Sequence, residues 1–124
     1  MLDDGFQHLP LARDLDIVVT AAGTLATDAV LPKGRLREPV AALARASMLV
    51  VVGADDAAAA AEARAYGVPI GVGATRRLGA PVTLQGAPPS RDRALVAMAG
   101  IGQPAQFVAG LSADGWQVRD TCVY

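Results

Sequence analysis

Residues 48–72 read MLVVVGADDAAAAAEARAYGVPIGV, and this stretch decides the fold class. The apolar, β-branched run at 48–52 predicts a strand, and the run at 68–72 predicts a second one. Pro69 places the second strand at a sheet edge, or marks the point where the strand begins. A helical segment separates the two runs, so the stretch predicts a parallel strand–helix–strand unit.

The segment between these strands carries the signals of a helix start and a helix stop. Asp55 and Asp56 are typical of a helix N-terminus, and Gly67 after Tyr66 is typical of a C-terminal stop. The intervening residues are mostly alanine, which favours helix by intrinsic propensity rather than by an apolar face. We therefore expect this helix to lie on the outside of the fold.

Working outward, the same alternation of strands and helices continues in both directions. Upstream we predict a buried strand at 15–20 (LDIVVT) and a helix at 38–46. Downstream we predict a connector at 75–93 with one short strand at 82–84, then a strand at 94–99, a helix at 104–113 and a last strand at 116–119. This order predicts an α/β fold with a mostly parallel sheet. We expect one partial domain, divided into residues 1–74, the connector and residues 94–124.

Composition excludes several classes of protein. Of 124 residues, 52% are hydrophobic and 19% charged, which is typical of a globular domain. The net charge of -1 offers no basic surface for a nucleic-acid partner. Cys122 is the single cysteine, which favours a reducing compartment. The sequence predicts neither a membrane span nor a signal peptide. Two apolar residues lead directly into Asp3, which suggests a strand that has lost its beginning.

Asp3-Asp4-Gly5-Phe6-Gln7-His8 is the first candidate site. Carboxylates at the carboxyl end of a strand in an open α/β sheet lie where ligands bind, and Mg²⁺ takes one or two carboxylates together with phosphate oxygens. We expect one of Asp3 and Asp4 to face the metal while the other acts through water, with Gln7 and His8 nearby. The alternative is a polar turn after a strand.

The second candidate is the segment 31–39, LPKGRLREP. Arg37 is suited to phosphate oxygens, and Glu38 could add a carboxylate on the metal side. Taken alone, this motif favours a simpler interpretation, in which the two charges are a solvated helix start.

The third candidate is the turn 100–105, GIGQPA, which matches the loose G-x-G-x-x-A form of a dinucleotide-binding turn. Pro104 removes one N–H that would face a pyrophosphate, and Asp120 follows sooner than the pattern requires. A tight strand-to-helix turn is therefore favoured, and a Rossmann-like module remains the rival interpretation.

Together these motifs resemble the tetraacyldisaccharide 4'-kinase family. The family's Asp-Asp-Gly-Phe-Gln-His is met at 3–8, its Leu-Pro-x-Gly-x-Leu-Arg-Glu-Pro at 31–39, and its Ala-Gly-Ile-Gly-x-Pro-x-x-Phe at 99–107. Its Leu-x-Arg-Asp-Leu is met by Leu11, Arg13, Asp14 and Leu15.

The resemblance implies a P-loop-type three-layer fold, here truncated at the N-terminus, at the cytoplasmic face of the bacterial inner membrane. It implies transfer of the γ-phosphate of ATP, with Mg²⁺, to the 4'-hydroxyl of a lipid disaccharide 1-phosphate, giving lipid IVA. The site residues that it implies are Asp3, Asp4 and Glu38 as metal acids, Asp4, His8 and Arg37 as the catalytic set, and Gln7 and Arg37 on the nucleotide side.

The chain departs from the family pattern in two places. It has no G-x-x-x-x-G-K-[ST] motif, so the backbone cradle for phosphates is missing, and we expect negligible activity from this chain alone. The family carries that loop, and the helix that faces the membrane, upstream of Asp3. It also has Gly-Asn-Gly where this chain has Ala26-Thr27-Asp28-Ala29. A second class of function stays open: a non-catalytic interaction module that docks through a bare sheet edge.

Overall fold

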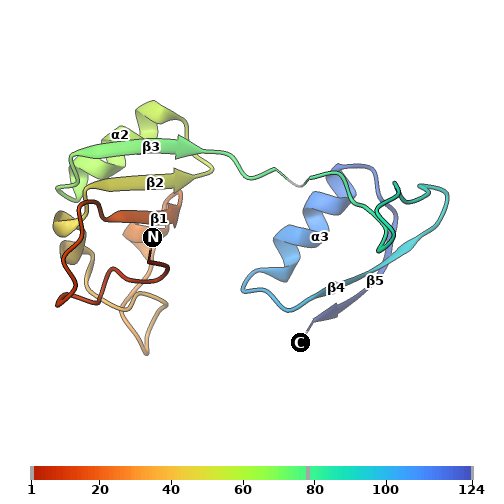
Figure 1. The fold of residues 1–124 in the computed structure, drawn as a ribbon, viewed down its shortest axis with the longest axis horizontal. Coiled ribbons are helices and arrows are strands. Elements are labelled where there is room, and N and C mark those ends of the chain that lie inside the picture. Colours follow the sequence, from red (N-terminus) through yellow and green to blue (C-terminus); the bar gives the residue numbers. More distant parts are fainter. Residues whose placement is uncertain (1, 78, 124) are drawn as a thin grey trace. The chain divides into compact units, whose positions relative to one another are not determined.

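The computed structural model describes residues 2–77 and 79–123. Contacts within the chain define two compact units, Met1–Arg76 and Arg77–Tyr124 (Figure 1). Each unit is described by itself. The expected division at 1–74, 75–93 and 94–124 stays a prediction.

The first unit is built on a three-stranded parallel sheet in the order β1-β2-β3. The strands are β1 (Ile17–Ala21), β2 (Met48–Val52) and β3 (Ile70–Ala74), which lie side by side in Figure 1. The middle strand matches the sequence prediction, and the outer two begin two residues later than expected. Pro69 immediately precedes β3, which is an edge strand, as predicted.

Three short helical segments accompany this sheet. Helix α2 (Asp56–Ala65) begins where it was predicted, because the side chain of Asp55 accepts a hydrogen bond from the N–H of Ala58 at 2.8 Å. The helix expected at 38–46 is a 3₁₀ segment, η1 (Val40–Arg45). A one-turn helix, α1 (Thr24–Thr27), was not predicted.

The core lies between β2 and α2. Leu49 and Val51 of β2 are completely buried. On α2, Ala59 is completely buried and Ala63 almost so. The expectation that α2 forms without a packed face is therefore wrong, whereas its other residues are exposed or half-buried, so the helix does lie on the outside of the fold. The helix lies so close to β3 that a β-carbon on Gly71 would collide with the backbone of Ala59, which accounts for the glycine at this position.

The opposite face of the sheet is apolar and largely uncovered. Val19, Val50 and Val72 are partners across the three strands, and Val19 is 64% exposed. Ile17 is 51% exposed on the same strand. The prediction of a fully buried first strand is thus wrong: only alternate residues of β1 turn toward the core.

The second unit is a single strand–helix–strand motif (Figure 1). Strands β4 (Leu95–Ala99) and β5 (Val118–Val123) pair in parallel, and α3 (Pro104–Ala113) connects them. The helix matches its predicted bounds, while the last strand starts two residues later than expected. Residues 82–84 form no strand but lead into a turn, so that prediction is wrong.

These observations confirm the α/β class with parallel sheets. Within residues 2–77 and 79–123, no helix has the length and apolar character required to cross a membrane.

The contact between α2 and β3 generates a prediction about stability. Gly71→Ala is expected to lower the free energy of opening of the first unit by about 1–3 kcal/mol, because the added methyl group meets backbone rather than a movable side chain. Hydrogen exchange at the amides of Leu49 and Val51 measures this change. Gly102→Ala is the matched control, since a β-carbon there meets nothing within 4 Å. Equal effects from both variants would contradict the prediction.

Candidate functional site

The segment 3–8 forms a compact turn rather than the end of a strand. Asp4 has a φ of 53°, a left-handed conformation that aspartate tolerates better than most residues. The N–H of His8 donates to the carbonyl of Gly5 at 2.9 Å, which closes the turn. Asp3 and Asp4 therefore lie in a turn and not in a strand. The residue before Leu2 lies outside the described residues.

One ion pair joins the first two sequence motifs. Nη1 of Arg37 donates to Oδ2 of Asp4 at 2.6 Å, across 33 positions of sequence. Both side chains are largely exposed, 58% for Arg37 and 62% for Asp4. The structure therefore brings the Asp-Asp-Gly turn to the start of η1, as a shared site requires.

A cavity of about 150 Å³ lies beside this ion pair. Its polar lining comes from Gln7, Thr20, Arg37 and Glu38. Its apolar lining comes from Phe6, Leu36, Pro39 and residues of β1, α1 and η1. Three of the predicted site residues, Gln7, Arg37 and Glu38, thus share one hollow. The other predicted site residues, Asp3, Asp4 and His8, do not line this cavity.

Two arginines to which the sequence analysis assigned no role fix the loop 3–8 in place. The guanidinium of Arg45 stacks over the ring of Phe6, 4.8 Å from its centroid, and donates to Glu38 at 2.8 Å. Arg13 donates to the carbonyl of His8 at 2.5 Å and to Asp16 at 2.6 Å. The spacing of Arg13 and Asp16 is local and could have suggested their pairing. The contact between Arg45 and Phe6 depends on the fold.

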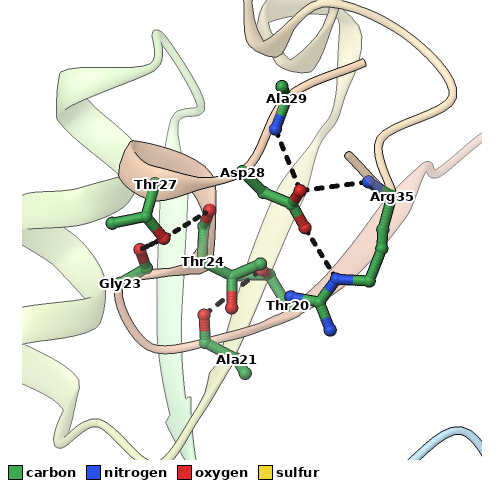
Figure 2. Close-up of polar contacts among 8 residues, drawn as sticks. All are labelled: Thr20, Ala21, Gly23, Thr24, Thr27, Asp28, Ala29 and Arg35. Atoms are coloured by element: carbon green, nitrogen blue, oxygen red, sulfur yellow. Dashed lines mark hydrogen bonds and ion pairs between the residues drawn. The ribbon is translucent and has the colours of Figure 1, made fainter. Parts of the chain in front are cut away.

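The loop of residues 28–36, here called the Asp28 loop, leads into the arginine and glutamate of the site. Oδ1 of Asp28 accepts from the N–H groups of Ala29 and Arg35 at 2.9 and 3.0 Å, and Oδ2 accepts from Nε of Arg35 at 2.8 Å. Figure 2 shows the carboxylate between these donors. Hydrogen bonds to the carboxylate hold the pKa of Asp28 below the usual aspartate value. The bond from the N–H of Arg35 has the largest effect, and the bond from the Arg35 side chain has the next largest.

The acids of the site have the right chemistry for Mg²⁺ but do not form a three-acid cluster. Carboxylate oxygens are the hard donors that Mg²⁺ prefers, and one or two suffice when phosphate and water complete its shell. Asp4 and Glu38 fit such a partial set, because Asp4 contacts Arg37 and Glu38 follows Arg37 in the sequence. Across the described parts of the chain, no three His, Cys, Asp or Glu side chains converge as a metal site. The metal roles of Asp3, Asp4 and Glu38 stay predictions.

The Gly-rich turn 100–105 lies in the second unit. It connects β4 to α3, and Pro104 is the first residue of that helix. Pro at this position lacks only an N–H that a helix start leaves unbonded. The dinucleotide-binding interpretation of this turn stays a prediction.

Comparison with known proteins gives one family. The family described as Tetraacyldisaccharide-1-P 4'-kinase matches residues 1–124. A tetraacyldisaccharide 4'-kinase from Chlorobaculum parvum is 40% identical over 129 residues, which cover 98% of this chain and 36% of that protein. One from Nitrobacter winogradskyi is 40% identical over 131 residues, covering 95% and 35% respectively.

A solved structure is similar over nearly the same extent. The crystal structure described as an "apo" form of LpxK from Aquifex aeolicus in complex with ATP has a TM-score of 0.63 and 27% sequence identity. The similarity covers 98% of this chain and 38% of that one. The chain thus spans about a third of the length of the relatives that it matches.

The exposure of the Asp4–Arg37 pair predicts a small contribution to stability. A double-mutant cycle with Asp4→Asn and Arg37→Gln is expected to give a coupling energy of about 0.2–1 kcal/mol, because water screens both charges. Hydrogen exchange at the β2 amides supplies the four free energies. A coupling above about 2 kcal/mol would show that the pair holds the fold together, contrary to this expectation.

Proposed function

Because this chain belongs to the tetraacyldisaccharide 4'-kinase family, we propose that it supplies the metal-side and phosphate-side residues of an ATP-dependent kinase. The proposed reaction moves the γ-phosphate of ATP to the 4'-hydroxyl of tetraacyldisaccharide 1-phosphate, giving lipid IVA. One observation carries the proposal. Arg37, which suits phosphate, contacts Asp4, which suits a metal, at the rim of a cavity that Gln7 and Glu38 also line.

Phosphoryl transfer depends on positioning and charge stabilisation, and these residues fit both tasks. We assign Asp4 and Glu38 to holding Mg²⁺, with Asp3 acting through water. When bound, this ion neutralises charge on the β- and γ-phosphates. Arg37 has a planar fork of donors that matches the equatorial oxygens of the transferred group.

The remaining assignments concern orientation and location. We assign Gln7 to the nucleotide side of the cavity, and His8 to the reacting end, where it donates to or orients a polar group of the substrate. His8 is exposed and does not line the cavity, so this role requires the substrate to extend beyond it. The lipid substrate places the protein peripherally at the cytoplasmic face of the inner membrane.

A second candidate is a non-catalytic interaction module. The observation that favours it is the uncovered apolar sheet face with Ile17 and Val19 exposed, since large apolar surfaces mark interaction sites. Size-exclusion chromatography and a kinase assay test this candidate. A stable complex with a partner that covers this face, without any phosphoryl transfer, supports the interaction module.

The chain by itself is expected to give no detectable product. Its residues include no G-x-x-x-x-G-K-[ST] sequence, so backbone N–H groups and a lysine for the phosphates are not supplied. The measurement incubates the purified 124-residue chain with MgATP and tetraacyldisaccharide 1-phosphate and follows phosphate transfer by chromatography. Formation of lipid IVA would refute this expectation.

A chimera tests the proposed roles directly. In the Chlorobaculum parvum relative, the aligned segment is replaced by these 124 residues, so that the rest of that protein accompanies the candidate site. The chimera is expected to phosphorylate the disaccharide. Asp4→Asn, Glu38→Gln or Arg37→Met should each lower kcat by roughly 100-fold or more, because each removes charge stabilisation from the transition state.

The control is Glu62→Gln, which removes a carboxylate from α2, away from the cavity lining. Circular dichroism confirms that each variant is folded. If the folded Asp4 and Glu38 variants are as active as the control, these acids do not hold the metal and the proposed site is wrong.

A further inference from the structure

Asp28 lies between two segments that form separate walls of the cavity. Its own N–H donates to the carbonyl of Thr24 at 2.9 Å and closes the end of α1. That helix contributes Leu25, which is buried and lines the cavity. On the other side, the Asp28 carboxylate binds the backbone and the side chain of Arg35, two residues before Arg37.

The Asp28 loop is also closed by its own backbone. The N–H of Leu36 donates to the carbonyl of Ala29 at 3.0 Å, and the N–H of Leu31 donates to the carbonyl of Leu36 at 2.9 Å. Gly34 passes so close that a β-carbon there would collide with Ala29 and with the Asp28 carboxylate. The carboxylate is therefore packed into the loop.

The burial of the two partners differs in an informative way. The Asp28 side chain is 11% exposed, whereas that of Arg35 is 68% exposed. A surface ion pair contributes little when both groups are mobile. Here the Asp28 carboxylate already accepts from two backbone N–H groups, one of them that of Arg35 (Figure 2), so forming the ion pair requires ordering only the Arg35 side chain.

We infer that Asp28 is a positioning residue: its carboxylate fixes the Asp28 loop against α1 and thereby sets the placement of Arg37 and Glu38 in the cavity wall. Asp28 itself touches no residue of the reacting set. It acts through Arg35 and Leu36. Its importance for catalysis rests on the proposed function, whereas its effect on the placement of Arg37 does not.

The ionisation of Asp28 makes the structure of the Asp28 loop depend on pH, and this dependence can be measured separately from the stability of the fold. Because the pKa of Asp28 is lowered in the folded chain, its ionised form is the one that the loop binds. The sign follows: the stabilisation is complete above the usual aspartate pKa and is lost as the pH falls through the lowered value.

The experiment uses the ¹⁵N-labelled 124-residue chain without nucleotide or lipid. As the pH falls, the amide signals of Ala29 and Arg35 are expected to report one shared ionisation, with a midpoint below that of an ordinary aspartate. In Asp28→Ala, amide exchange at Arg35 and Leu36 should accelerate about tenfold or more, and the signals of Arg37 should shift. Exchange at Leu49 and Val51 should stay within about twofold of the parent chain.

Two further variants sharpen the comparison. Asp28→Asn keeps one acceptor oxygen but loses the charge, so it should restore part of the protection and abolish the shared titration. Asp120→Asn is the matched control, because Asp120 also accepts from the next residue's N–H, at 2.8 Å to Thr121, but lies in the second unit. It should leave Ala29, Arg35 and Arg37 unchanged.

Two results overturn the inference. One is an Asp28→Ala chain in which Arg35, Leu36 and Arg37 keep the parent signals and exchange rates. The other is equal acceleration at Leu49 and Arg35, which would make Asp28 a general stabiliser of the fold. Neither result depends on catalysis, so failure of the chimera and failure of this inference are distinguishable.

Discussion

The close approach of α2 to β3 is the constraint on which the first unit depends. A helix can lie this near to a strand only where both surfaces are almost flat, and here glycine on the strand meets alanine on the helix. Gly71 faces the backbone of Ala59, and Ala59 and Ala63 are buried against the sheet. The small contact leaves room for Leu49 and Val51, which fill the core beneath the helix. Larger side chains at these positions would lift the helix and open the core to water.

The site is assembled beside this core by charged side chains that reach between loops. The residues of the turn 3–8 belong to no helix or strand, and arginines tie them to three different places. Arg37 binds Asp4, Arg13 binds the carbonyl of His8, and Arg45 covers the ring of Phe6. Arginine suits this task because its planar fork binds several partners at once and its long stem spans gaps between loops. Polar contacts of this kind place functional groups accurately while adding little to the stability of the fold.

Membership of the kinase family suggests a chemical role for these contacts. The chain matches only part of each relative, so that role concerns only part of the kinase site. The chain carries acids and an arginine that suit the metal and phosphate side of phosphoryl transfer, whereas a phosphate-cradling motif is not among its 124 residues. It spans about a third of the relatives that it matches. The face of the sheet around Val19 is apolar and exposed.

Much of this structure could be predicted from the sequence, because the relevant signals are local. Runs of β-branched residues, the cap at Asp55 and Pro104 at a helix start indicated β2, α2 and α3 nearly residue by residue. The same reasoning was wrong about the burial of β1 and about the lack of a packed face on α2, since burial depends on which elements pack together. The motifs at 3–8 and 31–39 named the candidate residues. Only the tertiary structure decided that Asp4 meets Arg37, that Arg45 covers Phe6, and that Asp28 closes the loop between two cavity walls. The physical reason is the range of each interaction. Capping and strand propensity act over a few residues, whereas Asp4 and Arg37 are 33 residues apart and Phe6 and Arg45 are 39 apart, so the packed core sets their separation.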